Sequence, residues 1–200
     1  MKYRLIFERT GQVTCKDSFG RIIWVIVKEL RDNIKILTDK DRKVLTKLLN
    51  ETLRQFTDDQ PEYISKKVAN VLFNKSLGTD PFKMTEYMRG RIFGKGIYRT
   101  VVFEHTTPIK QLLDYMMLDA KDVNDICEAL FRYSGTALIT TEEDNCLTRK
   151  GARTFREDWK DVYMSCDIEL LDPEQFSTYK TQNSKRFNIT KTDPDTDNNI

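Results

Sequence analysis

The sequence predicts an α+β fold that is predominantly helical and contains a small, mostly antiparallel sheet. Two observations point to this class. Apolar residues recur at helical spacing in several long segments, whereas segments of strand character are few and short. Because a parallel α/β sheet needs strands and helices in regular alternation, the shortage of strands favours the α+β class. The 200 residues are enough to bury one hydrophobic core without the help of disulfides or metals.

The chain is expected to form two parts of one core, followed by a tail. Residues 1–77 should hold an N-terminal strand or hairpin and then helices, and residues 78–172 the α+β part of the same core. Apolar residues become sparse after Pro173. Residues 173–200 are therefore predicted to form a polar, disordered tail.

The first part opens with strand character and continues with helical character. Residues 2–15 predict a short strand, or a hairpin that turns at Thr10-Gly11. Residues 19–33 predict a helix with an N-cap at Asp17-Ser18. The apolar run over residues 22–27 would suit a buried strand equally well, so both assignments stay open.

Two further helices of the first part have apolar stripes at helical spacing. Thr38 suits the N-cap of one helix, and Pro61 suits the first turn of the next. Gly78 would end the second of these helices. The stripes consist of Leu45, Leu48, Leu49, Leu53 and Phe56 in the first helix and Ile64, Val68, Val71 and Leu72 in the second.

The second part should supply the small sheet and more helices. Residues 97–103 and 137–139 have strand character, and the N-terminal strand could join them. Helices are expected to begin at Pro108, at Asp119 or Asp122, at a capping box over residues 141–144, and at Trp159.

Composition and charge narrow the classes of function. The chain carries 33 basic and 31 acidic residues and a net charge of +2, so any electrostatic partner must bind a local patch. No apolar run reaches membrane-spanning length, and residues 1–4 are not followed by the apolar core of a signal peptide. We therefore expect a soluble, cytoplasmic protein with no membrane partner.

The cysteines and the single histidine argue against a zinc site of the usual kind. The four cysteines are scattered along the chain and include no C-x-x-C pair. In a cytoplasmic chain, scattered cysteines are expected to be small, buried, apolar side chains.

A basic and aromatic stretch, residues 82–99, is the strongest candidate for a binding site. Four aromatic residues alternate with cations, and three glycines allow close approach of the backbone to a ligand. Arginines neutralise phosphates and aromatic rings stack on bases, so this composition suits nucleic acid. The alternative is a glycine-rich turn with solvated cations. The nucleic-acid-binding residues predicted here are Lys83, Arg89, Arg91, Lys95 and Arg99.

A second basic cluster is predicted to bind nucleic acid together with the first. If the two clusters fold side by side, they would form one positive face. The alternative is a solvated helix end, where cations are favoured by the helix dipole. The residues of this second cluster are Arg149, Lys150, Arg153 and Arg156.

One short pattern suggests chemistry. Glu104-His105-x-x-Pro108 resembles the opening of the HNH endonuclease motif. That resemblance implies that Glu104 ligates a metal ion, Mg²⁺ or Mn²⁺, and that His105 is the general base acting on water. The rest of the motif is missing, and the second metal ligand would have to be Asp114, Glu142, Glu143 or Asp144. The alternative for His105 is a hydrogen bond to a threonine or a carboxylate at the strand end.

The leading hypothesis is therefore that the chain is a nucleic-acid-binding protein. If it is also an enzyme, we expect a small metal-dependent nuclease. The alternative is a non-catalytic protein-interaction module, such as a regulator or inhibitor. The near-neutral charge and the missing catalytic motifs favour the alternative. The arrangement of the two basic clusters separates the two hypotheses, because nucleic-acid binding predicts one continuous basic face.

Overall fold

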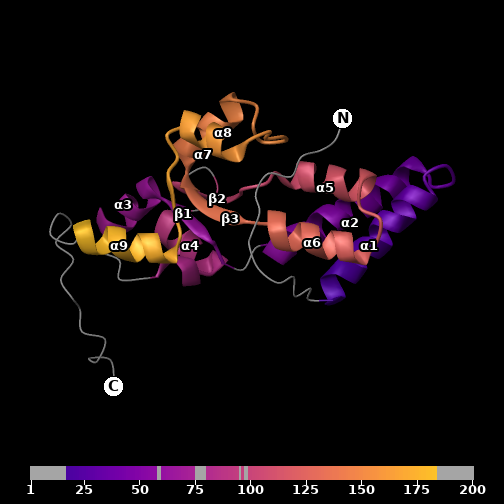
Figure 1. The fold of residues 1–200 in the computed structure, drawn as a ribbon, viewed down its shortest axis with the longest axis horizontal. Coiled ribbons are helices and arrows are strands. Elements are labelled where there is room, and N and C mark those ends of the chain that lie inside the picture. The colour runs from indigo at the N-terminus through magenta and orange to yellow at the C-terminus, as the bar shows by residue number, and fades with distance from the viewer. Residues whose placement is uncertain (1–16, 58–59, 75–79, 95, 97–98, 184–200) are drawn as a thin grey trace, which may run out of the picture.

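The computed structural model describes residues 17–57, 60–74, 80–94, 96 and 99–183 (Figure 1). The strand or hairpin predicted over residues 2–15 lies outside these ranges. Within them the chain is predominantly helical with one small sheet, so the predicted α+β class is confirmed. None of the described helices is long and apolar enough to cross a membrane.

The sheet has four strands in the order β2-β3-β1-β4 and is mixed. Strand β3 pairs antiparallel with β2 and parallel with β1, and β1 pairs antiparallel with β4. Strand β2 therefore lies at one edge. The strands are β1 (Tyr63–Ser65), β2 (Val101–His105), β3 (Thr136–Thr140) and β4 (Leu170–Leu171).

Strand β1 corrects the helix predicted to start at Pro61. Ile64 belongs to this strand, opposite Leu138, and is fully buried. The helix begins only at Lys66, as α3 (Lys66–Asn74). A strand of three residues is held by its pairing with both neighbours, and periodicity over so short a run does not separate strand from helix.

Four helices form a layer beside the sheet, at the right of Figure 1. Two of them come from the second half of the chain, so this layer crosses the expected boundary at residue 77. In the first helix, Ile23 and Val27 are buried while Val25 is exposed, which settles that the run over residues 22–27 is helical. The helices are α1 (Asp17–Asp32), α2 (Asp39–Thr57), α5 (Ile109–Leu118) and α6 (Val123–Tyr133).

The remaining helices cover the two faces of the sheet (Figure 1). Alternation along β2 directs Val101 and Phe103 to one face and Val102 to the other. The first face packs against α3, the 3₁₀ turn η1 (Pro81–Lys83), α4 (Glu86–Phe93) and α9 (Pro173–Asn183). The second face packs against α7 (Thr141–Arg149) and α8 (Trp159–Ser165).

Helix α9 corrects the predicted start of the tail. Residues 173–183 are helical, and the rings of Phe176 and Tyr179 lie 5.7 and 5.9 Å from that of Phe73. Two aromatic residues at i and i+3 are enough to anchor this polar helix to the core. Any tail starts beyond residue 183 and lies outside the described residues.

A buried glutamate joins β1 to the start of α7. The capping box predicted over residues 141–144 forms one residue earlier, with Thr140 as the cap and Glu143 as its partner. Glu143 Oε2 accepts hydrogen bonds from the Thr140 backbone N–H and from the Ser65 hydroxyl, each at 2.7 Å. Burial raises the pKa of Glu143, whereas these hydrogen bonds lower it.

Two cysteines form a disulfide, which corrects the expectation of small apolar thiols. Cys146 on α7 is bonded to Cys166 at the end of α8, with the Cα atoms 5.7 Å apart. That separation lies in the usual range for disulfides. The pairing arises because α7 and α8 cover the same face of the sheet, a relation that cysteine spacing does not reveal.

Candidate functional site

A cavity of about 670 Å³ lies over the sheet face covered by α4. Three arginines line it, and Glu86 is the acid among its described lining residues. Its wall includes Phe93, Val101 and Leu138, which are buried, so the cavity reaches down to the hydrophobic core. We call this the arginine cavity and define it by Arg54, Arg89 and Arg99 together with Glu86, Tyr87, Gly90, Phe93, Gly94, Gly96, Val101, Phe103 and Leu138.

The chain between α4 and β2 places Arg99 at the cavity. Helix α4 starts after Thr85, whose hydroxyl accepts the Met88 backbone N–H at 3.3 Å. It ends at Gly94, where φ is 83°, a conformation that favours glycine. Thr100 N then donates to Phe93 O at 2.8 Å, so the chain returns along the helix end.

Glu86 and Arg99 lie at different ends of α4, whereas Arg89 lies within the helix, three residues after Glu86. Glu86 is the first residue of this helix, and Arg99 follows its C-terminal end. Seven helical steps separate Glu86 from Phe93, or about 10 Å along the axis. Residues 86–93 of the basic and aromatic stretch are therefore helical and do not form a glycine-rich turn.

Arg89 is held in place before any ligand arrives. Its Nη1 donates to Met84 O at 2.8 Å, and its guanidinium carbon lies 4.5 Å from the centroid of the Phe103 ring. A planar guanidinium fixed by stacking and a hydrogen bond loses little conformational entropy on binding an anion. Because it is half-buried, Arg89 also contributes to packing.

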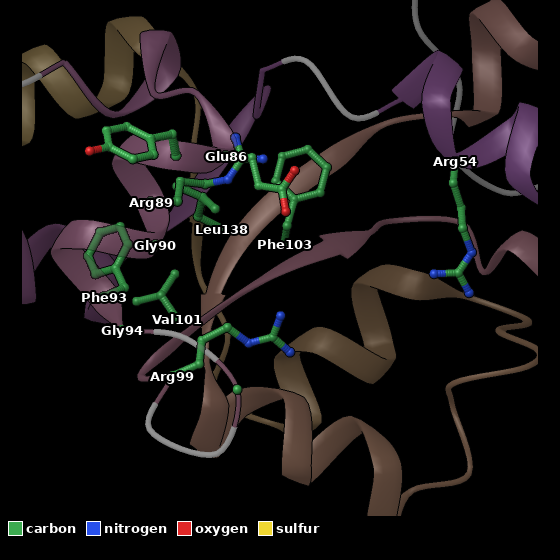
Figure 2. Close-up of a pocket in the computed structure, with 12 residues that line it drawn as sticks. Arg54, Glu86, Arg89, Gly90, Phe93, Gly94, Arg99, Val101, Phe103 and Leu138 are labelled. Carbon is green, nitrogen blue, oxygen red and sulfur yellow. The ribbon is translucent and has the colours of Figure 1, made fainter.

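Arg54 is a cavity residue that the sequence did not reveal. It comes from α2, in the helical layer, and lines the same cavity as Arg99. Figure 2 shows the Arg99 guanidinium directed away from Phe93 and Val101, while Arg54 stands at the right, apart from the other labelled residues of the cavity. The two residues are far apart in the chain, so no local motif could have joined them.

Two other cations predicted in this stretch, Lys83 and Arg91, are not among the described residues that line the cavity. Lys83 is exposed, 3.6 Å from Asp80. The Arg91 guanidinium lies 5.9 Å from the centroid of the Tyr87 ring. Lys95 lies outside the described residues.

The second basic cluster belongs to the opposite face of the sheet. It follows α7, which packs with α8, whereas α4 covers the other face. Arg149 and Lys150 are exposed, and Arg153 lies 3.3 Å from Asp144. The cations of η1 and α4 are thus carried by elements on the side of the sheet opposite α7. Arg99 lies in the linker before β2, where its carbonyl oxygen accepts a hydrogen bond from the Thr141 hydroxyl at 2.7 Å.

Arg156 is a buried structural cation, which corrects its assignment to nucleic acid. It is only 2% exposed and is paired with Glu104. Its side chain also donates to Ala152 O, His105 O and Thr106 O at 2.8–2.9 Å and to the Tyr163 hydroxyl at 3.2 Å. With its donors directed at these groups and its surface covered, Arg156 cannot reach a phosphate.

Glu104 and His105 do not form the arrangement that the HNH resemblance implies. They are neighbours in β2 and point to opposite faces. Glu104 pairs with Arg156, while the His105 ring packs edge-on against Phe103 at 6.2 Å. Among the described residues, no three His, Cys, Asp or Glu side chains come together as a metal site.

The two side chains have shifted protonation equilibria. Burial raises the pKa of Glu104, against the opposing charge of Arg156. Burial lowers the pKa of His105 to about 4, and the charges of Arg54 and Arg156 lower it further. His105 is therefore neutral at neutral pH and contributes no positive charge beside the arginine cavity.

The low pKa of His105 predicts a loss of stability in acid. The unfolded chain binds a proton near pH 6.5 and the folded chain only near pH 4, so stability falls as pH drops through this window. This difference between the two pKa values of His105 contributes up to about 3 kcal/mol to the free energy of unfolding. Denaturant unfolding of the wild type and His105→Gln should show a flatter pH dependence for the variant. Equal slopes in the two proteins would contradict the burial of a neutral histidine.

No family model, curated protein or solved structure matches the chain.

Proposed function

We propose that this protein binds nucleic acid without cleaving it, through the arginine cavity. The observation that carries the proposal is the convergence of Arg54, Arg89 and Arg99, from separate segments, on one cavity of about 670 Å³. Cavities of this size hold small ligands or parts of larger ones. The three guanidinium groups among the described lining residues favour an anion, and arginine suits phosphate in particular.

The cavity also offers contacts for a base. Tyr87 lines it and is 65% exposed, so one large aromatic surface faces solvent at the rim. Base–aromatic stacking stabilises single-stranded complexes by about 1–3 kcal/mol per base. A duplex hides the faces of its bases within the stack. We therefore expect single strands to bind more tightly than duplexes.

A binding role fits the geometry better than a nuclease role. The two residues nominated for metal and proton chemistry, Glu104 and His105, lie on opposite faces, and Glu104 is paired with Arg156. The described acids and histidine do not fit a Mg²⁺ or Mn²⁺ centre. The proposal therefore includes no metal-dependent step.

A protein-interaction module is the second candidate, because two observations favour it. The basic residues of α4 and those at the end of α7 lie on opposite sides of the sheet, so they do not form the continuous basic face that nucleic-acid binding predicted. A separate apolar surface also favours protein contacts. Three aliphatic side chains in and before α2 are strongly exposed: Ile36, Val44 and Leu48. Val44 and Leu48 lie four residues apart on α2 and so share one face of this helix. Exposed apolar groups that share a face are typical of protein contacts. If no nucleic acid binds, this surface becomes the leading candidate for function.

Fluorescence anisotropy with single- and double-stranded DNA and RNA, at several salt concentrations, tests the proposal. Arg54→Ala and Arg99→Ala should each weaken binding to a single strand roughly tenfold, because each removes a charge-assisted hydrogen bond. Each should also reduce the log–log salt slope by about 0.7. Both residues are exposed, so the melting temperature should change little.

Lys47→Ala is the matched control. Lys47 is exposed on the same helix as Arg54 but is not among the residues that line the cavity. Its replacement by alanine removes one positive charge, as Arg54→Ala does. It should leave binding unchanged. A second comparison, Arg149→Ala with Lys150→Ala, tests the other basic cluster. If that pair weakens binding and the two cavity variants do not, the arginine cavity is not the binding site.

A further inference from the structure

A second cavity, of about 440 Å³, lies within the helical layer. Its described lining comes from α1, the turn after α1, α2 and α5, and these three helices stand together at the right of Figure 1. We call it the helical groove. Leu30 and Leu49 are buried and form its deep part, whereas Ile34 is 49% exposed at its rim. Leu113 and Met117, both partly buried, complete its apolar lining.

Helical periodicity brings the lining residues to one side of α2 and one side of α5. The lining positions follow each other at steps of three, four, seven or eight residues along a helix. They are Arg42, Thr46, Leu49 and Asn50 on α2 and Lys110, Leu113, Asp114 and Met117 on α5. Leu48 is two residues from both Thr46 and Asn50, or about 200° around the helix. The helical groove is therefore separate from the exposed surface of Val44 and Leu48.

The charged side chains of the helical groove leave one cation available. Lys110 Nζ lies 3.3 Å from Asp114 Oδ2, so these two charges on α5 offset each other. Arg42 Nε and Nη2 donate to Leu37 O, which carries no net charge, at 3.2 and 3.1 Å. The ion pair of Arg42 with Asp39 spans 3.6 Å, and the Asp39 side chain is 89% exposed. Since so exposed a pair is weak, Arg42 can serve a second anion.

A donor of Arg42 remains for that anion. Within the part of the chain that the structure describes, no oxygen accepts a hydrogen bond from Arg42 Nη1. The other two guanidinium nitrogens are fixed by Leu37 O, so the side chain is held in place before a ligand binds. A guanidinium prepared in this way suits a carboxylate.

The apolar lining favours an alkyl chain as the body of the ligand. It consists of aliphatic side chains and the thioether of Met117, and no aromatic ring is among the described lining residues. A planar aromatic ligand would find no ring for stacking there. The flexible side chain of Met117 adapts to the shape of an apolar chain. The volume of about 440 Å³ is in the range of cavities that hold small ligands.

We infer that the helical groove binds an alkyl carboxylate of the medium-chain fatty-acid class. The alkyl chain lies against Leu30, Leu49 and Leu113, and the carboxylate accepts a hydrogen bond from Arg42 Nη1. The helical groove shares no described lining residue with the arginine cavity. This inference therefore stands or falls independently of nucleic-acid binding.

Calorimetric titration of the full chain with octanoate, decanoate and dodecanoate, at neutral pH and below their micelle concentrations, tests the inference. The affinity should rise roughly two- to fourfold for each added methylene, because each one buries more apolar surface. Decanol and decylammonium provide the same chain with a neutral and a positive head. Both should bind roughly fivefold or more weakly than decanoate, because they cannot accept a charge-assisted hydrogen bond.

Variants assign the binding to the helical groove. Arg42→Gln should lower the affinity for decanoate to that for decanol and leave decanol unchanged, and Arg42→Lys should retain part of the preference. Thr46 is exposed and lines the groove, so Thr46→Phe should fill it and weaken decanoate and decanol roughly tenfold or more. Leu48→Phe, on the other side of α2, is the matched control and should change neither. Circular dichroism of each variant establishes that it is folded.

The remaining outcomes overturn the inference. Equal affinities for decanoate, decanol and decylammonium would remove the anionic head group. Decanoate binding that Thr46→Phe leaves intact would place the ligand elsewhere. An acidic amphipathic peptide that binds the wild type but not Thr46→Phe, while no carboxylate binds, would make the helical groove a peptide site. Absence of binding to all three carboxylates would also refute the inference.

Discussion

Replacing Arg156 with alanine is expected to lower the free energy of unfolding by about 3–5 kcal/mol. The variant leaves the carboxylate of Glu104, whose side chain is only 15% exposed, without its cation. It also removes the donors that Arg156 directs to His105 O and Thr106 O, at the end of β2. Denaturant unfolding followed by circular dichroism at neutral pH measures the loss.

Arg153→Ala is the matched control for this prediction. Arg153 lies three residues earlier and pairs with Asp144 at 3.3 Å, but its side chain is largely exposed. Its loss should cost less than about 1 kcal/mol. Similar losses for the two variants would contradict the buried role of Arg156.

Two further substitutions test the cause of the loss. Glu104→Gln in the Arg156→Ala background should recover part of the stability, because it removes the unpaired buried charge. Arg156→Lys should not restore full stability, because an ammonium group cannot reproduce the planar fork that serves several acceptors at once. If Arg156→Ala instead folds normally and loses nucleic-acid binding, the residue acts on the ligand after all.

Removing the disulfide between Cys146 and Cys166 should cost about 3 kcal/mol. The bond closes a loop with a sequence separation of 20 residues. A loop of this length restricts the unfolded chain, and the loss of that restriction raises the entropy of the unfolded state by an amount that corresponds to about 3 kcal/mol. Replacing both cysteines with alanine avoids an unpaired thiol. The unfolding free energy of this double variant, measured without reductant, should fall below that of the wild type by this amount.

Reductant is the control for the disulfide prediction. With excess dithiol present, the wild type and the double variant should unfold at similar denaturant concentrations. Peptide mapping without reduction should recover the segments that contain Cys146 and Cys166 as one linked species. Alkylation of both thiols in the unreduced, unfolded protein would show that the bond is not formed.

Local interactions let the sequence alone determine much of the helical part. Pro108 precedes α5, and Asp122 caps α6 by accepting the backbone N–H groups of Asn124 and Asp125. Such signals lie within one helical turn, so they can be recognised without knowing the fold. The same holds for the helical stripe of α1.

The tertiary structure decided which short apolar runs became strands. Ile64 and Leu171 lie opposite each other in β1 and β4, although strands of three and two residues carry no periodicity to recognise. Their stability comes from pairing with partners that are distant in the chain. Sequence patterns therefore placed Ile64 on a helix.

The tertiary structure also decided what each charged residue does. Arg153 and Arg156 are alike in the sequence, yet one is exposed and the other lies among buried acceptors. The stretch around Arg99 could be recognised as a candidate from its composition, because its residues are close in the chain. Arg54 joins it only because α2 packs beside the sheet. Whether a charged side chain is buried, and which distant residues lie near it, depends on the whole fold. No local sequence pattern could therefore predict either.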